Sequence, residues 1–145
     1  MGDFKLEKAI GYAVNRAALR MKAELQRAFR TKDYNLTTEH WAVMNCLWEK
    51  EGPTQTEIAR KIAKDKTNVT RILDIMERNG LIKREYHESD RRSYRIFLTQ
   101  EAWKMKDELI AIAEEVSLVA TRGLSAKNER DIIRLMNVIN SNLEK

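Results

Sequence analysis

Polar side chains that can donate and accept hydrogen bonds are concentrated between residues 64 and 78. Apolar residues recur at helical spacing in this segment, so the other side chains share the open face of one helix. Arginine can donate two hydrogen bonds to guanine, asparagine can pair with adenine, and threonine can reach a phosphate or a thymine methyl group. This chemistry suits a major groove, although a polar face that touches only water is the alternative. The apolar face comprises Val69, Ile72, Leu73 and Met76, and the open face Thr67, Asn68, Thr70, Arg71, Asp74 and Arg78.

Basic side chains flank this face and recur further along the chain. Lys64 and Lys66 lie at the start of the helix, where free backbone amides already favour a phosphate. Arg91 and Arg92 lie in a polar span between two β-prone runs, where they could enter a narrow minor groove or form an ordinary charged turn. The charge of Arg95 either lies near phosphates or solubilises an exposed strand.

The net charge of +5 is concentrated in the middle of the chain. Residues 54–99 contain eleven basic and seven acidic side chains, whereas residues 100–145 contain seven and eight. Positive charge gathered in one segment is typical of a surface that binds polyanions, although it also fits a solvated surface.

Two short helices position these side chains. The run Thr54-Gln55-Thr56-Glu57 has the form of a capping box and predicts a helix to about Ile62. Asp65 is a suitable N-cap for the next helix, which ends at Asn79 and Gly80 because glycine readily adopts the left-handed backbone beyond a helix. Two helices joined by so few residues predict a helix-turn-helix.

A β-hairpin is predicted directly after this pair. Residues 81–86 and 93–99 are rich in β-branched and aromatic side chains, and the span between them is polar. Long amphipathic helices are predicted at residues 6–29 and 99–120, with a last helix capped by Ser125. Their apolar faces are too large for a small monomer, so we expect them to pack within the chain and across a dimer axis.

The expected fold is therefore mainly α with a small β-hairpin wing. A winged helix-turn-helix DNA-binding domain spans residues 36–99, between an N-terminal dimerisation helix at 1–35 and C-terminal dimerisation helices at 100–145.

Several stretches resemble the MarR family of winged helix-turn-helix transcriptional regulators. The order of elements is similar over nearly the whole chain, and the match is most specific between Leu36 and Thr99. His40 and Ala102 depart from the family pattern, which more often has Gln and Gly there. The matching stretches are residues 36–47, 54–59, 70–74, 80–84, 90–92 and 98–99.

The resemblance implies a homodimer on a pseudo-palindromic operator in double-stranded DNA, with recognition helices in successive major grooves. It implies an arginine at the wing tip, best matched by Arg92. Many such proteins repress their own operon and are released by small, often phenolic, ligands or by oxidants. The expected DNA-binding residues are Thr54, Gln55, Lys64, Lys66, Thr67, Asn68, Thr70, Arg71, Arg91, Arg92 and Arg95.

Two further features bear on regulation. Tyr12, Arg16, Trp41 and Met44 are candidates for an effector pocket, but the same residues fit a structural core, which we favour. Cys46 is expected to be a buried, inert thiol, since it lies mid-helix among large apolar side chains.

Other classes of protein are disfavoured. The sequence has no nucleophile–base pair, Gly-rich phosphate loop or metal-ligand spacing, so we expect neither an enzyme nor a metal or other cofactor. It has no apolar run that predicts a signal peptide or membrane span, and its single cysteine agrees with a cytoplasmic location. A protein-interaction or scaffold module without sequence-specific DNA binding is the alternative function. Operator, effector, and repression versus activation stay open.

Overall fold

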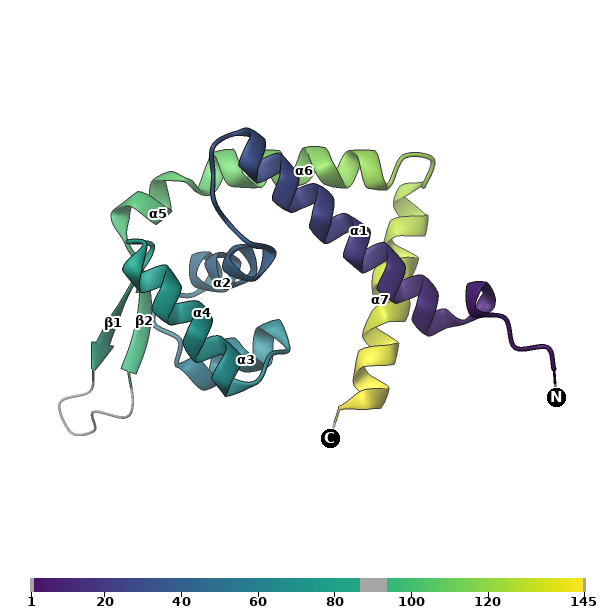
Figure 1. Cartoon of the computed structure of the whole chain (residues 1–145), viewed down its shortest axis with the longest axis horizontal. Helices are drawn as coiled ribbons and strands as arrows, with labels where there is room; N and C mark the ends of the chain where they lie inside the picture. The colour runs from purple at the N-terminus through teal and green to yellow at the C-terminus, as the bar shows by residue number, and fades with distance from the viewer. Residues whose placement is uncertain (1, 87–93, 145) are drawn as a thin grey trace.

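The computed structural model describes residues 2–86 and 94–144 and is mainly helical, with one two-stranded antiparallel hairpin (Figure 1). The predicted fold class is confirmed. A 3-10 turn, η1, at Leu6–Lys8 precedes the helices α1 (Ile10–Thr31), α2 (Thr38–Glu49), α3 (Gln55–Ile62), α4 (Lys66–Arg78), α5 (Gln100–Lys104), α6 (Lys106–Ala120) and α7 (Ala126–Leu143), and the strands are β1 (Ile82–Tyr86) and β2 (Tyr94–Leu98).

Helices α3 and α4 form the predicted helix-turn-helix. The Thr54 hydroxyl accepts from the Glu57 amide at 3.2 Å, which is one half of the predicted capping box. Asp65 caps α4 by accepting from the Asn68 amide at 2.8 Å. The turn between the helices places Ala63 in the left-handed region, with φ of 56°, a conformation that costs an L residue about 1–2 kcal/mol.

The hairpin lies beside α4. Ile82 pairs with Leu98 at its base and Tyr86 with Tyr94 at its far end. An isolated bridge between Thr54 and Arg95 joins the start of α3 to the outer edge of β2. Strand β2 therefore pairs with β1 along one edge and with the residue before α3 along the other.

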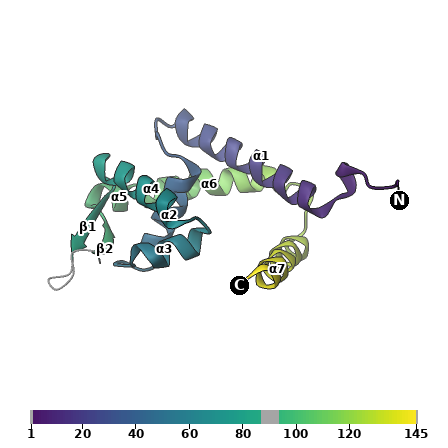
Figure 2. The same ribbon diagram turned by 60° about the horizontal axis from the view of Figure 1, so that its bottom comes forward.

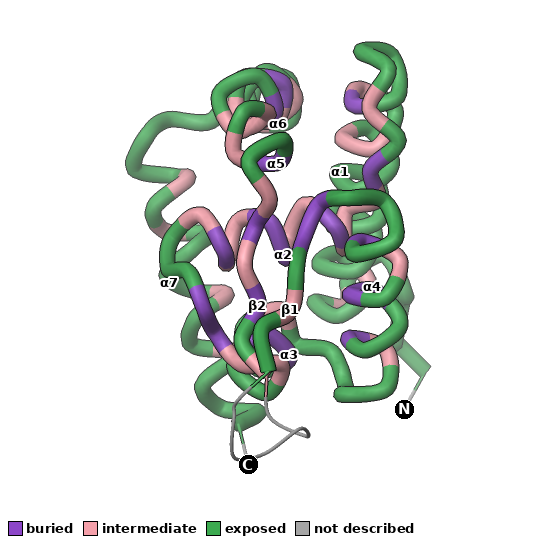
Figure 3. The backbone as a smooth tube through the Cα atoms, turned by 90° about the vertical axis from the view of Figure 1, so that its left-hand side faces the viewer, coloured by how far each residue is buried: buried purple, intermediate pink, exposed green. Residues whose placement is uncertain are grey.

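One hydrophobic core lies beneath these elements, and α1 and α6 contribute to it (Figure 3). Phe29 near the end of α1 and Leu109 in α6 are fully buried. They tie the terminal helices to the winged domain by burying apolar surface. The most deeply buried side chains from the winged domain are Val43, Met44, Leu47, Ile58, Val69, Leu73, Met76 and Ile96.

Two predicted helices are divided in the structure. The helix expected over residues 6–29 begins only at Ile10, because Ala9 is extended and provides no side-chain cap. The helix expected over residues 99–120 is divided at Met105. The Met105 amide donates to the carbonyl of Ala102, three residues earlier, as in a 3-10 turn. The two halves pack against different elements, α5 against β2 and α6 against α1.

Helix α7 begins at the far end of α6 and runs down separately from the winged domain (Figures 1 and 2). None of its described residues is buried, although it includes several large apolar side chains. Ile133 is 62% exposed and Val138 is 49% exposed.

Candidate nucleic-acid interface

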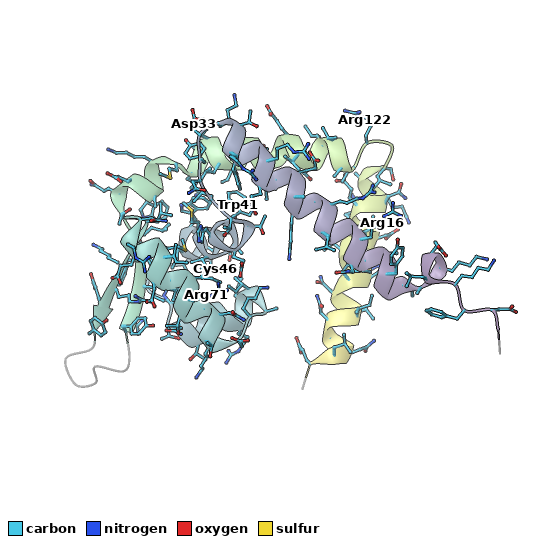
Figure 4. All side chains as sticks on the ribbon, viewed as in Figure 1. Arg16, Asp33, Trp41, Cys46, Arg71 and Arg122 are labelled. Carbon is cyan, nitrogen blue, oxygen red and sulfur yellow. The ribbon has the colours of Figure 1, made fainter. Side chains whose placement is uncertain are left out.

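The outward face of α4 presents an ordered row of polar groups. The Asp65 carboxylate, besides capping the helix, accepts from the Asn68 side-chain amide at 3.0 Å. The Asn68 side-chain oxygen in turn accepts from the Arg71 guanidinium at 3.3 Å. Arg71 is exposed and labelled on this helix in Figure 4. Its guanidinium is therefore held by a neighbour one helical turn away, and it makes no other hydrogen bond to residues 2–86 or 94–144.

The other predicted residues at the start of α4 are exposed to solvent. Lys64, Lys66 and Thr67 all lie at the turn or in the first turn of the helix. Free backbone amides and the helix dipole favour an anion at this end. The structure therefore places these three near one another on a surface suited to phosphate.

Thr70 and Gln55 are engaged with the protein itself. The Thr70 hydroxyl donates to the Lys66 carbonyl at 2.8 Å and accepts from the side-chain amide of Gln55. That amide also donates to the Lys66 carbonyl at 3.1 Å, and its oxygen accepts from the Tyr94 hydroxyl. Both side chains therefore connect elements at the base of the surface.

Arg95 also makes a contact within the protein. Its guanidinium donates to the Gly52 carbonyl at 2.9 Å, at the turn between α2 and α3. This bond secures the outer edge of β2, a role that the sequence did not indicate. Arg91 and Arg92, expected at the tip of the wing, lie outside the described residues.

Arg84 is the residue that sequence reasoning missed. Its side chain is only 8% exposed and forms ion pairs with Asp74 at 2.8 Å and Glu77 at 2.7 Å, both on α4. Burial opposes its charge, but these carboxylates and Tyr94 raise the pKa of Arg84 above its usual value. The available signal was the pair of acidic residues three apart on α4, followed by an arginine on the next strand. Asp74, predicted on the open face, therefore helps to fix the wing.

The four effector-pocket candidates are spread over the chain. Met44 is fully buried in the core, and Trp41 is partly buried against Phe29 and Trp48. Tyr12 and Arg16 lie in the first half of α1, and Figure 4 shows Arg16 at the α7 end of the molecule, away from Trp41. One chain does not gather the four residues around a single site.

Cys46 is half-buried on α2, and burial raises the pKa of its thiol, with Lys61 opposing this effect. The raised pKa disfavours the reactive thiolate.

Within residues 2–86 and 94–144, no cluster of three or more His, Cys, Asp or Glu side chains is arranged to hold a metal ion. No described helix combines the length and apolar character needed to cross a bilayer.

A helix pair whose second helix exposes hydrogen-bonding groups beside a two-stranded wing defines a winged helix-turn-helix protein. Residues 36–94 match the family model described as the MarR family. This match covers the helix-turn-helix and most of the segment in which the sequence resemblance is most specific. The family and its structural neighbours are regulators rather than enzymes.

Solved structures share this fold over almost the whole chain. BpsR of Bordetella bronchiseptica, whose DNA binding is described as regulated by 6-hydroxynicotinic acid, has a TM-score of 0.85 at 20% identity, covering 96% of this chain and 98% of that chain. A MarR-family regulator from Silicibacter pomeroyi has a TM-score of 0.79 at 21% identity, covering 99% and 96%. The repressor CouR bound to a 23-mer DNA duplex has a TM-score of 0.78 at 26% identity, covering 97% and 99%.

Proposed function

We propose that this protein is a homodimeric repressor that binds a pseudo-palindromic operator through α4 and the wing. The row Asp65–Asn68–Arg71 carries this proposal, since it orders a guanidinium on an exposed helix face before DNA arrives. A group ordered in advance loses less conformational entropy on binding. Arg71 then reads a guanine in the major groove, and Lys64, Lys66 and Thr67 bind the flanking phosphates. The capture of the similar CouR on a DNA duplex supports this assignment.

The segments 1–35 and 100–145 supply the dimer interface in this proposal. A cavity of about 600 Å³ lies between α1 and α6, with Ala17, Met21, Val116 and Val119 among its largely apolar walls. The apolar residues of α7 stay exposed in one chain. A second copy covers both surfaces by pairing terminal helices, and its two recognition helices then lie about one turn of DNA apart, roughly 34 to 36 Å.

Substitution of Arg71 tests the recognition surface. Arg71→Ala should weaken operator binding by about 1 to 3 kcal/mol and relax the base preference at one position in each half-site. Lys64→Ala is the matched control, because loss of a phosphate contact should weaken binding to all sequences alike. Fluorescence anisotropy with an operator selected from a random duplex pool, and with single-base variants of it, measures both effects at fixed salt.

If Arg71→Ala kept the wild-type base preference, α4 would not be the helix that recognises bases. The competing function, a protein-docking module, makes a different prediction about salt. Binding to DNA should fall steeply as salt rises because counterions are released, whereas docking through apolar contacts should not.

Release by a small aromatic effector is the second part of the proposal. The aromatic side chains of Phe29, Trp41 and Trp48 form a cluster where α1 meets α2, with ring centroids 5.3 and 5.7 Å apart. The indole nitrogen of Trp48 is buried without a hydrogen-bond partner among the residues that the structure describes. Such an unpaired donor costs about 1–3 kcal/mol, which an acceptor on a ligand would offset. Tyr12 and Arg16 would have to reach this site from a second copy of the chain.

Trp48→Phe tests the effector site by removing the donor while keeping an aromatic ring. With 6-hydroxynicotinic acid as the probe, the concentration that releases operator DNA should rise about tenfold in the variant, and operator affinity without probe should stay the same. If the same probe concentration released operator DNA from wild type and from Trp48→Phe, the effector would bind elsewhere.

A further inference from the structure

The side chain of Gln55 joins three elements of the candidate interface. It is the first residue of α3, and its amide nitrogen donates to two groups on α4, the Lys66 carbonyl at 3.1 Å and the Thr70 hydroxyl. Its amide oxygen accepts from the hydroxyl of Tyr94, the first residue of β2. Gln55 thus connects the start of the recognition helix to the strand that leads out of the wing.

A side-chain amide has two N–H donors and one oxygen. In Gln55 the nitrogen bonds two acceptors and the oxygen bonds one donor, so both ends of the group are occupied by the protein. Gln55 could donate a hydrogen bond to DNA only if one of the bonds from its nitrogen broke. The observed geometry therefore favours an internal role.

We infer that Gln55 is a positioning residue that fixes the wing relative to the recognition helix. The inference rests on the proposed DNA-binding function and sharpens it. Tyr94 is also held by the Arg84 guanidinium, 5.2 Å from its ring centroid, and Arg84 in turn pairs with Asp74 and Glu77 on α4. The wing is therefore tied to α4 near the start of the helix through Gln55 and further along it through Arg84.

Fixed spacing between helix and wing matters because the two enter different grooves. An untethered wing must be ordered when DNA binds, and this ordering reduces affinity. The bond from Tyr94 to Gln55 affects every operator sequence alike, since it touches no base. Its loss should weaken binding without changing which bases are preferred.

The link can be observed without DNA by following the side-chain amide signals of Gln55 in ¹H–¹⁵N NMR spectra. Tyr94→Phe removes only the hydroxyl and should shift these signals and speed their exchange with water. Tyr86→Phe is the matched control, because it removes the hydroxyl of the neighbouring tyrosine, whose ring lies 5.5 Å from that of Tyr94. Signals unaffected by Tyr94→Phe, or affected equally by both variants, would overturn the link.

Operator binding then tests what the link does. Tyr94→Phe and Gln55→Ala should each weaken binding roughly three- to tenfold, as expected for one hydrogen bond, and the double variant should bind like Gln55→Ala alone. Base preference should stay the same at every position. Relaxed preference at one position in Gln55→Ala, additive losses, or no loss in either variant would each refute the positioning role.

The two proposals fail in distinguishable ways. Should the wild-type protein bind no duplex at low salt, the proposed function falls, and the NMR shifts still decide whether Tyr94 and Gln55 are linked. Should it bind an operator that both variants bind equally well, only the positioning role falls.

Discussion

His40 helps to cap the N-terminus of α2 by accepting a hydrogen bond on its imidazole ring. Only the neutral form of the ring can accept this bond. The Thr37 hydroxyl accepts from the His40 amide at 3.1 Å, and the His40 Nδ1 accepts from the Thr37 amide at 3.4 Å. This reciprocal pair is a capping box in which an imidazole replaces the usual Glu or Gln. Burial lowers the pKa of His40, with Glu39 opposing this effect. The departure from the family pattern therefore leaves the helix start intact.

Acid should weaken this cap. Because the pKa of His40 is lower in the folded state than in the unfolded chain, its stabilising effect is complete above the unfolded value of about 6.5 and is lost as the pH falls below it. Urea unfolding at pH 7.5 and 5.0 should show that His40→Gln, which keeps an acceptor, loses about 1 kcal/mol less than wild type. All other titrating groups are the same in both proteins. Equal losses would show that His40 contributes nothing pH-dependent.

At the scale of elements, the turn between α2 and α3 depends on one glycine. Gly52 has φ of 76°, and a Cβ there would lie 3.2 Å from the Phe97 ring of β2. Its amide donates to the Ile96 carbonyl, and its carbonyl accepts from Arg95. The wing therefore packs directly on the backbone that leads into the helix-turn-helix.

Gly80 provides a matched control for Gly52. It also has φ of 76°, but no atom of the described part of the chain lies within 4 Å of its Cβ position. Gly80→Ala should cost about 1 to 2 kcal/mol of folding free energy from backbone strain alone, and Gly52→Ala should cost more because the Phe97 ring must move. Chemical unfolding measures both. Adding Phe97→Leu should recover part of the excess in Gly52→Ala; equal costs for the two alanine variants would refute the packing argument.

Elements with strong local signals were predicted well from the sequence. Asp65 and Gly80 bracket α4 as expected, and the hairpin forms within one residue of its predicted bounds at each described end. The division at Met105 depends on packing against β2 and α1, which local periodicity does not encode. The role of Gln55 was hidden for the same reason, since its partner Tyr94 lies 39 residues away.

At the scale of the whole molecule, the winged domain has a complete core and the terminal helices do not. Helix α6 lies along α1, but Ile10 and Leu19 on α1 stay 71% and 58% exposed. The apolar side chains of α7 add to this exposed surface. Exposed apolar surface of this extent is typical of a protein interface.

A charge placed on α7 should separate the proposed dimer. Ile133→Asp puts a carboxylate among side chains that would be buried by the second copy, at a cost of several kcal/mol. Light scattering after gel filtration should give twice the chain mass for wild type and the mass of a single chain for the variant. Lys127→Glu adds acidic charge to the first turn of the same helix and should leave the dimer intact. A dimeric Ile133→Asp protein would exclude this face of α7 from the interface.

The exposed face of α7 also makes the proposed repressor sensitive to its own abundance. Where most copies are unpaired, the amount of paired protein varies with the square of the total, so halving synthesis lowers it about fourfold. Operator occupancy then rises more steeply than in proportion to gene dosage, with a threshold below which little operator is bound. Substitutions that enlarge or trim the apolar side chains of α7 would move that threshold while leaving the recognition surface untouched.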